Sequence, residues 1–122
     1  MRSAIHVPEP PENPHRLAEE RSLAYHRAIA AKLCGDAEIL GQARQRVEHW
    51  LETGEVHPHY AEGWRDLLGQ PLDAIEQRLG DPGEEMRALR QCTPFAGALD
   101  PRERWRIWRE TAERLGVEPS LG

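Results

Sequence analysis

Three histidines are the first residues in the chain whose type and spacing could support chemistry. His49, His57 and His59 lie close together in sequence, and imidazoles beside carboxylates are groups that zinc and nickel accept as ligands. His57 and His59 flank a proline at an expected helix start, where their rings need not converge, and no recognised metal-ligand spacing is present. The pattern therefore favours helix-end and loop histidines over a metal site, and we expect no cofactor.

An arginine followed by a histidine five positions later occurs twice, as Arg21 with His26 and as Arg44 with His49. The spacing is similar to the Arg-x4–6-His element of helical ribonucleases of the HEPN type, in which both side chains lie at a cleft and cleave RNA without a metal. Sixteen basic residues and six histidines make chance matches common, and an acidic chain repels RNA. A ribonuclease is therefore the third hypothesis.

Two segments, residues 29–35 and 111–117, show the Ala-x3-Gly pattern of a helix-turn-helix. Too little sequence follows the second segment for a recognition helix. The helix after the first segment could read DNA through four polar side chains: Gln42, Arg44, Gln45 and Arg46. An ordinary helix hairpin is favoured, because the same helix carries a long apolar face, and a DNA-binding regulator is the second hypothesis.

The stretch from Ala88 to Glu110 differs most from the rest of the chain. It holds the only Phe and two of the four Trp. Trp105 and Trp108 have the spacing of a core stripe on the expected last helix. Three arginines share the outer face of that helix: Arg102, Arg106 and Arg109. This face is either a solvated basic side or a recognition surface, since Arg and Trp are enriched at interface hot spots.

Motifs for common catalytic chemistry are missing from the sequence. There is no Gly-rich phosphate loop, no Gly-x-Ser-x-Gly elbow and no Cys-x-x-Cys. The two cysteines, Cys34 and Cys92, match no metal spacing and are expected to be small semi-buried thiols. We predict no catalytic residues and a non-enzymatic protein.

Proline and glycine divide the chain into six expected helices, because prolines open helices and glycines close them. Val, Ile and Thr are scarce, which also favours helix over strand. The prediction is an all-α bundle, with a disordered or extended Pro-rich arm at 1–12, one helical domain at 13–116 and a frayed tail at 117–122. Asp81 is expected to cap a helix that begins at Pro82. Core side chains expected from helical periodicity include Ile29, Leu33, Val47, Trp50, Trp64, Leu72, Ile75, Leu79, Met86, Trp105 and Trp108, with Phe95 filling the core from a loop.

Charge is unevenly distributed along the chain, whose net charge is −5. Residues 47–86 carry two basic and ten acidic side chains, whereas residues 87–109 carry six basic and two acidic ones. Such a chain is a poor general nucleic-acid binder but a candidate for docking a basic partner. The acidic residues expected to meet that partner are Glu48, Glu52, Glu55 and Glu62.

Hydropathy gives a prediction for location. No apolar run approaches the roughly 18 residues of a membrane span, and the N-terminus shows no apolar core of a signal peptide. We therefore expect a cytoplasmic protein that makes no contact with a membrane.

Four segments together carry a resemblance to known proteins: HRAIAAKL, ARQRVEHWL, VHPHYAEGWRDLL and ALRQCTPFAGALDPRERWRIWRE. In this combination the chain resembles a group of short bacterial proteins of unassigned function, over nearly its whole length after the arm. Genes of this group are loosely associated with neighbours that resemble nucleotidyltransferase-type toxins of abortive-infection systems. The resemblance implies an antitoxin or partner role in a two-gene module, and it implies no catalytic residues.

The first hypothesis is therefore a helical interaction protein that neutralises a toxin or enzyme encoded beside it. In this hypothesis the acidic segment 47–86 covers a basic groove of the partner that is meant for nucleic acid or nucleotide. The Arg/Trp helix either completes the core or docks the partner.

Overall fold

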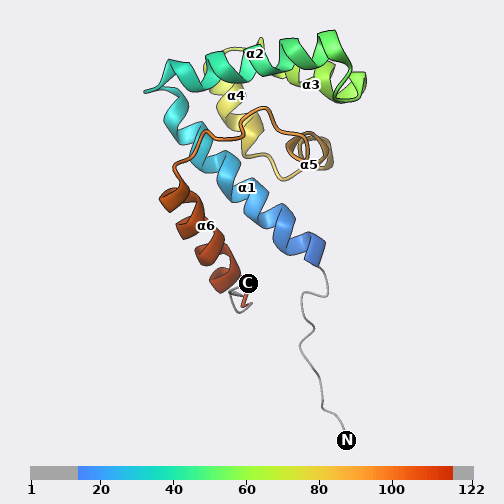
Figure 1. The fold of residues 1–122 in the computed structure, drawn as a ribbon. Coiled ribbons are helices and arrows are strands. Elements are labelled where there is room, and N and C mark those ends of the chain that lie inside the picture. Colours follow the sequence, from blue (N-terminus) through green and yellow to red (C-terminus); the bar gives the residue numbers. More distant parts are fainter. Residues whose placement is uncertain (1–13, 117–122) are drawn as a thin grey trace, which may run out of the picture.

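Residues 14–116 are the part of the chain that the computed structural model describes, and they are helical, with no strand in this range (Figure 1). The prediction of an all-α fold is confirmed. The predictions for the arm at 1–12 and for the tail at 117–122 lie outside the described residues. The six helices are α1 (Pro14–Leu33), α2 (Ala37–Thr53), α3 (Pro58–Leu68), α4 (Leu72–Leu79), α5 (Glu84–Arg90) and α6 (Pro101–Arg114).

Local sequence signals account for most of the helix boundaries. At the start of α2 the Asp36 carboxylate accepts the Glu38 N–H at 3.1 Å, and α2 ends at Gly54, whose φ of +74° is the left-handed conformation that glycine adopts most readily. The Asp100 carboxylate accepts the Arg102 N–H at 2.7 Å at the start of α6, where Pro101 is the first helical residue. These side chains and backbone conformations close helix ends that would otherwise leave polar groups unpaired.

The predicted start of α5 is wrong by two residues. The helix begins at Glu84, and Gly83 rather than Asp81 is its N-cap, without a side-chain cap bond. The Asp81 carboxylate accepts the Gly83 N–H at 2.8 Å. This Asx turn uses the carboxylate before it can cap a helix, and it holds Pro82 in the turn.

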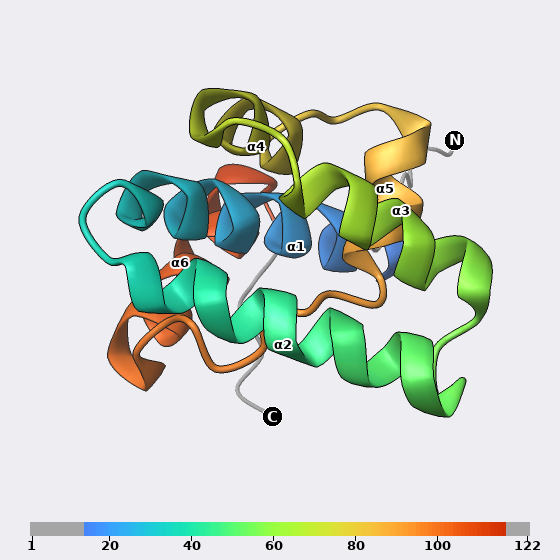
Figure 2. The ribbon, with the colours of Figure 1, turned by 90° about the horizontal axis from the view of Figure 1, so that it is seen from above.

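Helix α1 is the central element of the fold. Helices α2, α4, α5 and α6 all pack against it, and α2 and α3 form a hairpin across one of its ends (Figures 1 and 2). Ion pairs between Lys32 and Glu103 and between Arg114 and Glu20 show that α6 runs antiparallel to α1. Among the helices, α6 packs only against α1, so its other sides have no helical neighbour.

The core confirms most of the predicted apolar stripes, and it is centred on Trp64, whose side chain is fully buried. The Trp64 indole N–H donates to the Leu89 carbonyl oxygen at 2.9 Å, so the buried ring has its polar group paired. Phe95 packs edge-on against Trp64 and is buried as predicted. The confirmed core residues are Ile29, Leu33, Val47, Trp50, Trp64, Ile75, Leu79, Met86 and Phe95.

Leu72, Trp105 and Trp108 are expected in the core but are not buried. Trp105 is 50% exposed and Leu72 is 38% exposed, and Trp108 is only half-buried. On α6 the buried residues are Ile107, Thr111 and Ala112. Ala112 continues the 3-4 spacing of Trp105 and Trp108 and is buried as that spacing predicts, whereas Ile107 and Thr111 each lie one position before a predicted residue. The Thr111 hydroxyl donates to the Ile107 carbonyl oxygen at 2.8 Å, so Thr111 can lie in the core without an unpaired hydroxyl.

Arginines from neighbouring helices bind the carbonyl ends of α3 and α4. Arg44 of α2 donates to the Leu68 carbonyl oxygen at 2.8 Å, and Arg27 of α1 donates to that of Gly80 at 3.0 Å. Arg90 of α5 is only 5% exposed and donates to the carbonyl oxygens of Leu79 and Asp81 at 3.2 and 2.7 Å. These bonds satisfy carbonyls that a short helix cannot pair internally.

The buried position of Arg90 gives a testable prediction about stability. Replacing Arg90→Met keeps much of the aliphatic volume but removes the donors, and it leaves two carbonyls at the end of α4 without a partner. We expect the free energy of unfolding to fall by about 2–3 kcal/mol, measured by urea denaturation. The matched control is Arg102→Met, at an exposed position, where a change within about 0.5 kcal/mol is expected. An equal effect of both substitutions would contradict the assigned role of Arg90.

Candidate functional site

The outer side of α6 carries a pair of stacked tryptophans. The ring centroids of Trp105 and Trp108 lie 5.0 Å apart with their planes at 10°, and Trp105 is half-exposed as described above. Trp105 and Leu72 are the large hydrophobic side chains that are exposed among residues 14–116. Indole combines a large apolar area with few rotatable bonds, which is why tryptophan dominates many protein interfaces.

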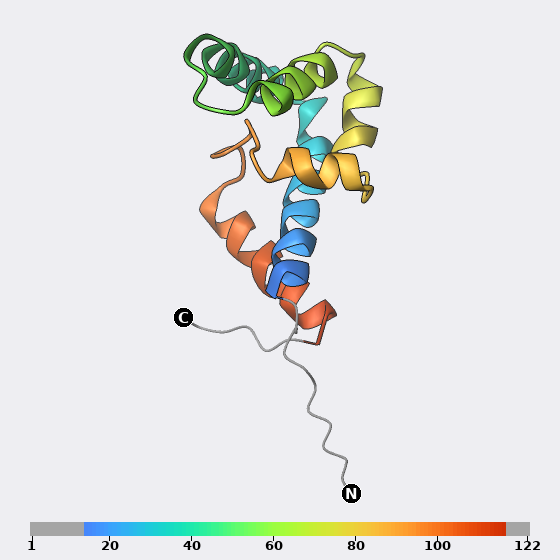
Figure 3. The ribbon, with the colours of Figure 1, turned by 90° about the vertical axis from the view of Figure 1, so that its right-hand side faces the viewer.

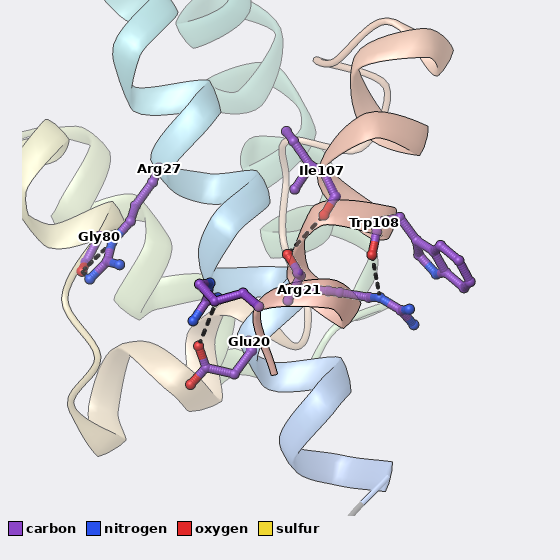
Figure 4. Close-up of polar contacts among 8 residues, drawn as sticks. Glu20, Arg21, Arg27, Gly80, Ile107 and Trp108 are labelled. Carbon is purple, nitrogen blue, oxygen red and sulfur yellow. Dashed lines mark hydrogen bonds and ion pairs between the residues drawn. The ribbon is translucent and has the colours of Figure 1, made fainter. Parts of the chain in front are cut away.

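Arg21 of α1 holds Trp108 in place from within the protein. Its guanidinium carbon lies 3.7 Å from the centroid of the Trp108 ring, and its Nε–H donates to the Trp108 carbonyl oxygen at 3.3 Å (Figure 4). Trp108 therefore contacts both Arg21 and Trp105, and the exposed Trp105 ring rests on a side chain that α1 holds in place.

The arginines of α6 are exposed as predicted, but they differ in how their charge is used. Arg106 forms ion pairs with Glu103 and Glu110 at 3.8 and 3.5 Å. Within residues 14–116, the guanidinium groups of Arg102 and Arg109 have no hydrogen-bond or ion-pair partner, and that of Arg104 has only the ring of Tyr25, 5.5 Å away. Their unbalanced charge is therefore available to a partner molecule.

The other described cations are already engaged. Arg21, Arg27, Arg44, Arg46 and Arg90 donate to backbone carbonyls, and Arg16 also has an interaction partner. The remaining ones form ion pairs: Lys32 with Glu103, Arg65 with Asp66, Arg78 with Glu85, Arg87 with Glu19 and Glu84, and Arg114 with Glu20. We define the α6 surface as Arg102, Trp105, Trp108 and Arg109.

The four predicted acidic residues lie elsewhere in the molecule. Glu48 and Glu52 are on α2 and Glu62 is on α3, all exposed and without an ion pair in the described range, whereas Glu55 pairs with His49 at 3.6 Å. The turn between α2 and α3 lies at one end of the molecule and α6 at another, as the three ribbon views agree (Figures 1, 2 and 3). The acidic and basic surfaces are therefore separate.

The histidines considered for a metal site have other contacts. The His57 Nδ1 accepts the His59 N–H at 3.1 Å and so caps α3. The rings of His57 and His59 both lie edge-on to Tyr60. Within residues 14–116, no group of three or more His, Cys, Asp and Glu side chains is arranged to hold a metal ion.

Neither Arg–His pair converges on a cleft in the described part of the chain. Arg21 reaches Trp108, whereas His26 points into the core and is 3% exposed. Arg44 binds the Leu68 carbonyl, whereas His49 is exposed and pairs with Glu55. Five positions separate the members of each pair, which places them about 140° apart around a helix. The ribonuclease hypothesis therefore gains no support from this geometry.

The residues proposed for DNA reading are partly engaged in the fold. Gln42 and Gln45 are exposed, but Arg44 binds the end of α3. Arg46 donates to the carbonyl oxygens of Pro94 and Ala96 at 2.8 and 3.1 Å and holds the loop before α6. Two of the four side chains would have to leave structural bonds to reach a base, so the DNA-binding alternative gains no support from their placement.

His26 is a structural residue whose role the sequence did not indicate. Its Nδ1–H donates to the Ser22 carbonyl oxygen at 2.7 Å, so its Nε2 accepts from the Thr93 hydroxyl at 2.8 Å. Burial lowers the pKa of His26 to about 4, against a raising effect of the Ser22 bond and with a further lowering by the positive charge of Arg90. The ring is therefore neutral at pH 7.

The thiols show no reactive arrangement among the described residues. Cys34 is exposed and Cys92 is half-buried, and neither forms a disulfide. Burial raises the pKa of the Cys92 thiol, which disfavours the reactive thiolate. The prediction of semi-buried thiols is confirmed for Cys92 and wrong for Cys34.

The low pKa of His26 predicts acid sensitivity. The unfolded chain takes up a proton near pH 6.5, but the folded protein does so only near pH 4. Stability is therefore lost as the pH falls through this range, by up to about 3 kcal/mol from this group. In urea denaturation from pH 7.5 to 4, the stability advantage of the wild type over His26→Gln should shrink by that amount. His49→Gln is the exposed control. An advantage that does not change with pH would contradict the assignment.

None of the described helices is long and apolar enough to cross a membrane.

Comparison with known proteins does not identify a family for this chain, and the resemblance to short antitoxin-like proteins stays a prediction. No protein-family model, curated protein or solved structure matches the chain.

Proposed function

We propose that this protein is a non-enzymatic helical module that binds a protein partner and neutralises a toxin or enzyme encoded beside it. The observation that carries the binding role is the α6 surface, where a half-exposed Trp105 rests on Trp108 between two arginines that have no partner among the described residues. The antitoxin role comes from the sequence resemblance. The proposed localisation is the cytoplasm, where such a partner would be made.

The physical basis of docking is the burial of Trp105. A tryptophan side chain buries about 150–250 Å², so covering the exposed half of this ring removes roughly 100 Å² of mainly apolar surface from water. At about 25 cal/mol per Å² this contributes roughly 2–3 kcal/mol to binding. Because stacking already fixes the indole, little side-chain entropy is lost when a partner covers it.

The acidic surface supplies the second part of the proposal. Glu48, Glu52, Glu55 and Glu62 would cover a basic groove that the partner uses for nucleic acid or nucleotide. Exposed carboxylates contribute mainly to the rate of association and to the choice of partner. The α6 surface would supply most of the affinity, and the acidic surface would block the groove.

Co-expression with the product of the adjacent gene tests the proposal. We expect a complex that co-purifies and a loss of toxicity. Trp105→Ala should weaken the complex by at least about 10-fold, as truncation of a hot-spot tryptophan does. Leu72→Ala, which removes the other exposed large hydrophobic side chain, is the matched control and should leave affinity unchanged. If no complex forms and toxicity is unaltered, the antitoxin role is excluded.

A charge reversal tests the acidic surface separately. The triple variant Glu48→Lys, Glu52→Lys and Glu62→Lys changes carboxylates that lack ion pairs, so thermal stability should stay nearly constant. We expect a slower association rate, by about 10-fold at low salt, and partial return of toxicity. Unchanged association and full neutralisation would rule out a role of these residues in covering the groove.

A further inference from the structure

We infer that the α6 surface takes an acidic helix of the partner protein, with carboxylates on both sides of an apolar anchor residue. This inference rests on the proposed docking role of α6 and names the chemistry of what docks there.

Arg102, Trp105 and Arg109 lie at positions i, i+3 and i+7 of α6 and therefore share one face of the helix. Seven residues of helix rise about 10 Å, so the backbone positions of the two arginines stand about 10 Å apart along the helix, with an exposed indole between them. A complementary helix presents Asp or Glu at i and i+7 and an apolar residue at i+3 or i+4. The pattern on α6 thus defines both the charges and the spacing of its ligand.

The charge balance of α6 supports an acidic ligand. Two of its own carboxylates are already occupied, since Glu103 binds Lys32 at 3.0 Å and Glu110 binds Arg106 at 3.5 Å. Glu113 is one turn beyond Arg109 but forms no ion pair with it in the described structure. Within residues 14–116, Arg102 and Arg109 have neither a carboxylate nor a carbonyl partner, and a guanidinium binds a carboxylate through parallel hydrogen bonds.

Two other occupants fit the surface less well. Pairing α6 with α6 of a second copy would bring Arg102 and Arg109 against the same arginines, which repel. Nucleic acid could stack a base on Trp105, but the net charge of −5 and the exposed carboxylates on α2 and α3 oppose a polyanion. An acidic protein helix avoids both conflicts, because it carries few charges beyond those that Arg102 and Arg109 neutralise.

Selection from a phage-displayed library of helical peptides, with the full-length protein as bait, tests the inference. We expect the enriched peptides to carry Asp or Glu at i and i+7 around Leu, Met or an aromatic residue. A synthetic copy of an enriched peptide should lose at least about 10-fold in affinity for the Arg102→Gln, Arg109→Gln double variant. Arg65→Gln, which removes an exposed cation already paired with Asp66 on α3, should bind the peptide like the wild type.

Several results would overturn the inference. These are enrichment of peptides without acidic residues, no enrichment above that obtained with Trp105→Ala as bait, or affinity that is insensitive to Arg102 and Arg109. Tighter binding of a single-stranded DNA oligonucleotide, or self-association lost in the double variant, would assign the surface to nucleic acid or to a second copy.

The test separates this inference from the proposed function. If acidic peptides bind α6 but the adjacent gene product does not, the surface chemistry stands and the antitoxin role is excluded. If the adjacent gene product binds independently of Arg102 and Arg109, and no acidic peptide is enriched, the antitoxin role stands and this inference is wrong.

Discussion

The bond from an arginine of one helix to a backbone carbonyl of another is the interaction on which this fold depends. Helices such as α4 and α5, with eight and seven residues, leave about half of their carbonyls without an intrahelical partner. Arg27, Arg44 and Arg90 supply donors to the ends of α3 and α4, and Arg46 supplies them to the loop before α6. One guanidinium reaches two carbonyls where a lysine would offer a point charge, so arginine suits this task. Short helices can therefore pack together although each is marginal alone.

This use of arginine also decides what the surface can do. A cation that binds a helix end is less available to a phosphate, because breaking its bonds leaves helix-end carbonyls without their protein donor. The sequence contains sixteen basic residues, which would suggest basic surface on several helices. In the part of the chain that the structure describes, the fold and its ion pairs leave Arg102 and Arg109 of α6 without partners. Among the described residues, the arginines without a hydrogen-bond or ion-pair partner thus lie on α6, beside the exposed tryptophan.

Much of the fold could be predicted from the sequence, because proline and glycine act locally. Pro58 and Pro101 begin helices and Gly54 ends one, each through its own backbone preference. Periodicity places Trp105 on the wrong side of α6, because adjacent stripes on a helix differ by one residue and periodicity alone cannot choose between them. Tertiary packing decides which stripe is buried. Ile107 and Thr111 pack on the side of α6 that faces α1, and the Thr111 hydroxyl donates a hydrogen bond to the Ile107 carbonyl oxygen. The carbonyl partners of Arg27, Arg44 and Arg46 and the hydroxyl partner of His26 lie more than 20 positions away in sequence, beyond the reach of local patterns.

The candidate site is built with the same bond that stabilises the fold. Arg21 binds the carbonyl of Trp108 as the other arginines bind helix ends, and its guanidinium also covers the ring that supports Trp105. Helix α6 has only α1 as a helical neighbour, so this single arginine links the orientation of the exposed indole to the central helix. A partner that covers Trp105 therefore meets a ring whose position is already set. The conformational entropy of the Trp105 side chain is already lost on folding, so little more is lost on binding, and a small surface can contribute substantial affinity.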